Sequence, residues 1–151
     1  MDGPSVFESL NEARPLAGIG VAELSGDVAV RYCGRLFSRL GAAVVRVRAD
    51  SADISDDFAA WLDQGKQLAG SADDALAALA GAERRLAVAG QSQADIARAE
   101  ARFAALADPP TLLAITWFDP RGAYGDWRAN DAPRAAAVKW TNGLLLWIIP
   151  S

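Results

Sequence analysis

Residues 126–133, DWRANDAP, gather side chains of the kinds that line polar sites. Trp127, Arg128, Asn130 and Asp131 are consistent with the rim of an active site, with a binding surface or with an ordinary loop. The chain contains no histidine, so the side chain that most often carries protons near neutral pH is missing. If this stretch is a site, its chemistry cannot rest on an imidazole.

Several other chemistries are excluded by composition. Without histidine there is no Ser-His or Cys-His catalysis and no histidine-containing metal site. The single cysteine, Cys33, cannot build a thiolate cage, and no acidic cluster has the spacing of a calcium loop. The Gly-Ile-Gly of residues 18–20 precedes its strand, so it is not a dinucleotide-binding fingerprint. We expect no metal.

A second charged pattern lies in residues 28–40. Arg31, Arg35 and Arg39 repeat every four residues and could attract phosphates, but such runs usually form a solvated helix face, which is the expectation here. Cys33 falls on the apolar face, which predicts a buried structural thiol. The large aromatic side chains are expected to pack rather than to serve as stacking platforms, and these are Trp61, Trp117 and Trp140.

The elements that must position these side chains alternate between strand and helix. Near-continuous apolar runs predict strands at residues 18–24, 42–47, 84–90 and 111–118. Helical spacing and capping residues predict helices at residues 28–40, 53–65, 71–82 and 92–108. Ser25 to Asp27 and Ser71 offer N-caps, and Gly41 ends the first helix. The pattern predicts an α/β fold with an open, mainly parallel sheet covered by helices on both faces.

Size and charge limit the setting in which the chain works. A chain of 151 residues fits one ordinary domain, and its net charge of −4 argues against a general nucleic-acid partner. The acidic N-terminus does not look like a signal peptide, and the longest apolar run is too short to span a membrane. With one cysteine, the expected location is the cytoplasm.

The order of these segments resembles the N-terminal part of the class III CoA-transferases, the family of carnitine dehydratase, the bile-acid-inducible F protein and α-methylacyl-CoA racemase. Those chains open with a Pro-Leu-x-Gly strand, a helix with a Cys-x-x-x-Leu pattern, and Leu-Gly-Ala before a valine-rich strand. The matching residues are Pro15, Leu16, Gly18, Cys33, Leu36, Leu40, Gly41, Ala42, Val44 and Val45. Later matches are Gly65, Lys66, Arg98, Phe118, Gly122 and Tyr124, so the resemblance covers residues 15 to about 135.

This resemblance implies a Rossmann-like domain that binds CoA or acyl-CoA and a dimer whose two chains interlock. In open α/β sheets ligands collect at the carboxyl ends of the strands. The residues expected around CoA are Asp27, Val28, Gly90, Gln91, Asn130 and the loop 119–131, with Lys66, Arg98 and Arg128 as cations. Solvated surface charge is the alternative for these three cations.

The departures from the family concern catalysis. Transferases of the family use an aspartate nucleophile, which the resemblance puts beyond residue 151, and racemases pair a histidine with an aspartate. Asn130 stands where that histidine would be, and it cannot shuttle a proton. We therefore expect no catalytic residue in this chain, which would be a truncated or naturally short relative. The alternatives are a non-catalytic CoA- or nucleotide-binding module and a structural interaction protein.

The organisation expected from the sequence has three parts. Residues 1–14 form an N-terminal extension, residues 15–135 the Rossmann-like domain, and residues 136–151 an apolar C-terminal segment. The six large apolar residues from Leu144 to Ile149 predict a surface for a second copy or a complementary subunit. The alternative is that they fold back as a last strand or helix of the same domain.

Overall fold

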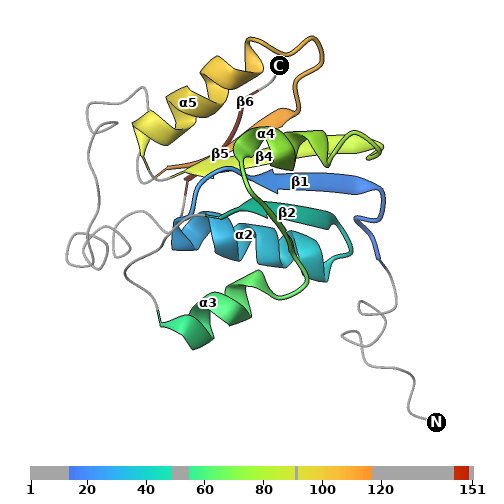
Figure 1. Cartoon of the computed structure of the whole chain (residues 1–151), viewed down its shortest axis with the longest axis vertical. Helices are drawn as coiled ribbons and strands as arrows, with labels where there is room; N and C mark the ends of the chain where they lie inside the picture. Colours follow the sequence, from blue (N-terminus) through green and yellow to red (C-terminus); the bar gives the residue numbers. More distant parts are fainter. Residues whose placement is uncertain (1–13, 49–54, 91, 117–144, 150–151) are drawn as a thin grey trace.

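A computed structural model describes residues 14–48, 55–90, 92–116 and 145–149, and these build a sheet flanked by helices (Figure 1). The strands are β1 (Ile19–Glu23), β2 (Ala43–Val47), β3 (Gln67–Ala69), β4 (Arg84–Gly90), β5 (Thr111–Thr116) and β6 (Leu145–Ile149). The helices are α2 (Val28–Arg39), α3 (Asp56–Asp63), α4 (Ala72–Ala77) and α5 (Gln93–Phe103).

The six strands lie in the order β3-β2-β1-β4-β5-β6. The first five are parallel, with Val21 opposite Val44 on one side and Leu86 on the other. Only β6 runs antiparallel, with Ala114 of β5 opposite Trp147. The predicted open, mainly parallel α/β sheet of Rossmann-like type is confirmed.

Helices lie on both faces of the sheet (Figure 1). On one face α2 buries Val30 against Val21, Val88 and Ile115, and α3 packs beside α2. On the other face α4 and α5 bury Ala75 and Phe103 against the alanine-rich side of the same strands. Both sides of the central strands are therefore shielded from water, which explains why those strands are nearly continuous apolar runs in the sequence.

The helix ends follow the expected capping chemistry. Asp27 and Ser71 are N-caps whose side chains accept hydrogen bonds from Val30 N–H and Asp74 N–H. Gly41 adopts a φ of 99° just after α2, a conformation that favours glycine over any residue with a Cβ. Local sequence therefore sets where these helices begin and end.

Several stretches differ from the expected boundaries. The helices expected over residues 71–82 and 92–108 end earlier than predicted, at Ala77 and Phe103. The long helix expected over residues 53–65 is described from Asp56 to Asp63, and the short strand β3 follows it without having been predicted. Strand β3 has three residues and alternates too briefly to leave a periodic signal.

The C-terminal apolar run forms the edge strand β6 beside β5 (Figure 1). This is the arrangement in which the segment folds back onto the same sheet. Its backbone pairs along the whole of β6, from Thr116 opposite Leu145 to Leu112 opposite Ile149.

The close approach of β4 to β5 and α2 generates a stability prediction. A Cβ added at Gly90 would lie 2.7 Å from the Ile115 carbonyl oxygen and 3.1 Å from Val30 Cγ2. We expect Gly90→Ala to lower the free energy of unfolding by about 1–3 kcal/mol, because a backbone oxygen in a sheet cannot move aside. Gly81→Ala is the control, since its Cβ would meet nothing within 4 Å. Urea denaturation measures both, and equal stability of the two variants would contradict the prediction.

Candidate functional site

The strand order reverses between β1 and β4, and the loops after these two strands meet at that point. Ser25, in the loop after β1, accepts a hydrogen bond through Oγ from Gly90 N–H at 3.1 Å. Neighbouring crossovers leave such a reversal point in opposite directions, which opens a crevice at the carboxyl ends of the strands. We call this edge of the sheet the crevice, and the candidate residues Asp27, Val28 and Gly90 all lie there.

Asp27 is held firmly at the start of α2. Its carboxylate accepts hydrogen bonds from Val30 N–H at 3.0 Å and from the Ser25 hydroxyl at 2.8 Å. Burial raises the pKa of Asp27, while these hydrogen bonds act in the opposite direction. A carboxylate therefore occupies part of the helix terminus where an anionic phosphate was expected, and the two negative groups would repel each other.

A second acidic residue faces the same crevice from α5. The Asp95 N–H donates to Ser92 Oγ at 3.0 Å, and the Ser92 hydroxyl donates to the Asp95 carboxylate at 2.7 Å. The negative charge of Asp95 contributes to the raised pKa of Asp27. Arg98 donates to Asp95 at 2.9 Å and keeps 68% of its side chain exposed. Arg98 is thus an exposed cation whose ion-pair partner is Asp95.

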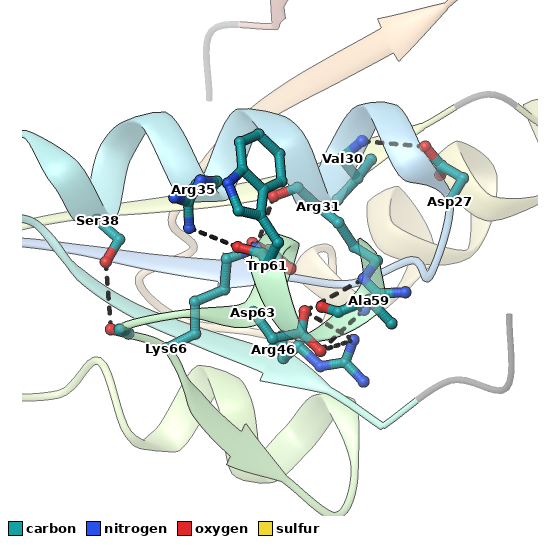
Figure 2. Close-up of polar contacts among 12 residues, drawn as sticks. Asp27, Val30, Arg31, Arg35, Ser38, Arg46, Ala59, Trp61, Asp63 and Lys66 are labelled. Carbon is teal, nitrogen blue, oxygen red and sulfur yellow. Dashed lines mark hydrogen bonds and ion pairs between the residues drawn. The ribbon is translucent and has the colours of Figure 1, made fainter. Parts of the chain in front are cut away.

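Lys66 lies elsewhere, beneath α2 (Figure 2). Its Nζ atom lies 2.5 Å from Glu23 Oε1 and donates to the Arg31 carbonyl oxygen at 2.6 Å. No part of the Lys66 side chain is exposed. The lysine expected to be a ligand cation is therefore an interior ion-pair partner in this structure.

Glu23 is the acidic partner and is equally buried, with 1% of its side chain exposed. A Cβ at Gly34 would lie 1.6 Å from Glu23 Oε1, so α2 has room for this carboxyl only because residue 34 is glycine. Burial raises the pKa of Glu23 to about 7, against the lowering effect of Lys66, and burial lowers the pKa of Lys66. Among the described residues Glu23 Oε2 has no hydrogen-bond partner.

The arginines of α2 correct one expectation. Arg31 and Arg35 are only 2% and 7% exposed, so they are not a solvated face, although Arg39 is exposed. Arg31 donates to the Asp63 carboxylate at 2.8 and 3.2 Å, and Arg46 of β2 reaches the same carboxylate at 3.1 Å (Figure 2). The aspartate at the end of α3 makes burial of both guanidinium groups tolerable.

Arg35 and Trp61 correct a second expectation. The Arg35 guanidinium donates to the Trp61 carbonyl oxygen and to Gln64 Oε1, and lies 4.0 Å from the centre of the Trp61 ring (Figure 2). Trp61 is 42% exposed and stacks on Phe58 and Tyr32, so it is a surface stacking residue rather than a core residue. Cys33 does pack against the core, and burial raises the pKa of its thiol to about 11.

Sequence reasoning missed the buried polar residues Glu23 and Arg46 and the half-buried Asp63. A signal for two of them exists, because Glu23 and Arg46 interrupt otherwise apolar strands in GVAEL and AVVRV. A charge at such a position must find a partner in the interior. Nothing in the sequence names that partner.

The remaining candidates lie outside the described residues. These are Gln91, Arg128, Asn130 and the loop 119–131, together with Trp117 and Trp140. Their places in a site stay predictions.

Away from the crevice, a cavity of about 320 Å³ lies beside α4 at the amino end of β4. Its lining is mostly apolar, including Leu76, Leu79 and Leu106. Of its charged residues, Arg85 and Asp108 pair with each other, and Asp73 pairs with Arg102. None of the candidate residues lines it. Within the described ranges no group of His, Cys, Asp or Glu side chains could hold a metal ion, and no helix is long and apolar enough to cross a membrane.

Comparison of the chain with protein-family models, with curated proteins and with solved structures found no match in any of the three.

Asp63 pairs with both Arg31 and Arg46, and this generates a prediction for the buried polar cluster. We expect Asp63→Asn to lower the free energy of unfolding by about 2–3 kcal/mol, because it removes the carboxylate that the buried Arg31 and Arg46 share. Asp73→Asn is the matched control, since Asp73 pairs with Arg102 on the surface and is 79% exposed. Its loss should stay below about 1 kcal/mol. Chemical denaturation measures both variants. Similar losses of unfolding free energy in the two would show that Asp63 contributes no more than a surface ion pair does.

Glu23 generates a prediction about pH. The pKa of Glu23 is 4.5 in an unfolded chain and about 7 in the folded one, so between these values the folded chain holds a proton that the unfolded chain releases. The free energy of unfolding contributed by Glu23 must then fall as the pH rises from 5 to 7. Glu23→Gln should lack this fall, and Glu100→Gln, on the exposed side of α5, should keep it. Denaturation curves at both pH values measure the slopes, and a Glu23→Gln slope equal to that of the unaltered chain would reject this assignment.

Proposed function

We propose that this chain binds CoA or an acyl-CoA, in the manner of the class III CoA-transferases, at the crevice between β1 and β4. The observation that carries the proposal is the reversal of strand order there, where Gly90 and the Ser25–Asp27 turn are joined. Open α/β sheets bind nucleotide-containing ligands at such points. The ordered motif matches over residues 15–135 select CoA from among those ligands.

The charges at the crevice indicate which part of CoA would lie where. Asp27 and Asp95 can accept hydrogen bonds from uncharged donors such as ribose hydroxyls or the amides of the pantetheine arm. The phosphates would lie away from these carboxylates, toward Arg98 and toward Arg128 of the loop 119–131. Val28, at the first position of α2 and 37% exposed, offers apolar contact beside the pantetheine arm.

Lys66 has a supporting role in this proposal. Its charge is already matched by Glu23, and bringing it to a phosphate would leave Glu23 buried and unpaired. The Lys66–Glu23 pair instead ties the loop after α3 to the end of β1, directly below the turn that holds Asp27.

We assign binding rather than transfer to this chain. Cys33 is a weak nucleophile, because its raised pKa keeps it protonated at neutral pH. Asp27 is committed to capping α2, and the chain has no histidine to act as a general base. The expected behaviour is saturable binding of CoA without CoA transfer.

A structural interaction protein is the alternative function. One observation favours it, namely an exposed apolar surface on α2 and α3 that includes Tyr32 and Trp61. Absence of any CoA binding would leave this alternative in place.

Calorimetry with CoA tests the proposed function. We expect Arg98→Ala and Arg128→Ala each to weaken CoA binding by about tenfold, the effect of losing one hydrogen bond to a charged group. Arg102→Ala is the control on the same helix, because Arg102 pairs with Asp73 of α4, away from the crevice. Dephospho-CoA and ATP, titrated in parallel, show which phosphates matter. Unchanged affinity in both Arg98→Ala and Arg128→Ala would reject the site, and no heat with any ligand would reject the function.

A further inference from the structure

A second concave site lies at the edge of the sheet opposite to the crevice. The cavity of about 320 Å³ opens between α4 and the turn that leads from α5 into β5, beside Arg85 near the start of β4. Gly90 ends the same strand, so the length of β4 separates the cavity from the candidate CoA site. Pockets that bind small organic molecules have volumes of about 300–1,000 Å³, and this cavity falls at the lower end of that range.

The walls of the cavity are apolar and reach from the core to the surface. Leu79 belongs to the core and is 2% exposed, whereas Leu106, after α5, is 41% exposed. Leu76 of α4 and the buried Pro110 before β5 also line the space. An apolar group bound here would cover Leu106 and leave water itself, which is favourable.

Two ion pairs flank the cavity. Arg85 donates to the Asp108 carboxylate and, at 3.1 Å, to the Asp108 carbonyl oxygen, and Arg102 donates to the Asp73 carboxylate. The arginine is the more buried partner in both pairs. The side chains of Arg85 and Arg102 are 27% and 33% exposed, and those of Asp108 and Asp73 are 85% and 79% exposed. The cations are therefore held against the protein, while the carboxylates stand in water.

We propose that this cavity binds a small amphipathic carboxylate, that is, an organic acid with a hydrocarbon tail. The tail lies against Leu76, Leu79 and Leu106. The carboxylate accepts hydrogen bonds from the Arg85 guanidinium in place of Asp108, because a planar guanidinium can hold a carboxylate through two parallel hydrogen bonds. Asp108 turns into water at small cost, since an ion pair with an exposed partner contributes little to stability.

The distribution of charge selects an anionic ligand. Arg85 lines the cavity and is the less exposed member of its ion pair, so a head group bound to it leaves the tail among the leucines. A cationic head would be drawn instead to Asp73 and Asp108, which stand in water, and its tail would be drawn away from the apolar walls. None of the residues assigned to CoA lines the cavity, so the two sites are independent.

Calorimetry with octanoate on the whole chain tests this site. We expect Arg85→Gln to weaken octanoate binding by about tenfold, because it removes a hydrogen bond to a charged group. Arg84→Gln is the matched control and should bind octanoate normally, since neighbouring residues of a strand point to opposite faces of the sheet. Asp108→Asn should tighten binding by about two- to fivefold, because it removes the carboxylate that competes for Arg85.

Amide NMR spectra locate the bound octanoate. We expect chemical-shift changes at Leu76, Leu79 and Leu106 and none at Gly90. The octanoate affinity should be the same with and without saturating CoA. Competition between octanoate and CoA would place the acid in the crevice, which overturns this site and leaves the proposed binding of CoA intact.

Each remaining outcome supports or overturns the carboxylate site. Weaker binding in Arg85→Gln with tighter binding in Asp108→Asn supports it, and an unfolded variant cannot produce the gain. No binding at millimolar octanoate overturns it, as does binding that Arg85→Gln leaves unchanged. Equal or tighter binding of octanol or of octyltrimethylammonium also overturns it, by assigning the cavity to a neutral or a cationic ligand.

Discussion

The structure depends on matching charges that α2 and β2 carry into the interior. Asp63 meets Arg31 of α2 and Arg46 of β2 there, and Glu23 meets Lys66 of the loop after α3. An isolated buried charge would cost several kcal/mol, so each of these groups constrains the place of another. Asp63 fixes α3 beside α2, and Lys66 fixes the start of β3 below α2. The edge of the sheet from β1 to β3 is thus specified by polar contacts as much as by apolar packing.

This polar interior decides which surfaces remain for function. Because the arginines of α2 turn toward α3, the tyrosine and leucines of α2 must turn outward. The glutamate at the end of β1 occupies the space that Gly34 leaves open, which brings α2 close to the sheet just below the Ser25–Asp27 turn. One set of ion pairs therefore shapes both the exposed apolar surface on α2 and α3 and the floor of the crevice.

The backbone was more predictable from the sequence than these contacts. Strand β4 begins and ends at the predicted residues 84 and 90, and α2 begins at the predicted Val28, because apolar runs and capping residues act locally. The burial of Arg31 depends on an aspartate 32 residues away, which helical spacing cannot reveal. The same limit applies to Lys66: the motif match placed it among ligand cations, whereas its contact with Glu23 depends on how β1 and the loop after α3 meet in space.

The crevice itself is more acidic than a phosphate site would be, and this narrows what it can bind. Asp27 and Asp95 lie close enough for the charge of one to raise the pKa of the other, while Lys66 is fully used by Glu23. A ligand presenting only phosphates would be repelled there at neutral pH. A ligand with a long uncharged arm bearing amides, and with its phosphates at a distance, can place the arm over the carboxylates and the phosphates near Arg98. CoA separates its phosphates from a long uncharged arm in this way and a simple nucleotide does not, so the proposed binding of CoA is compatible with the charges of the described part of the crevice.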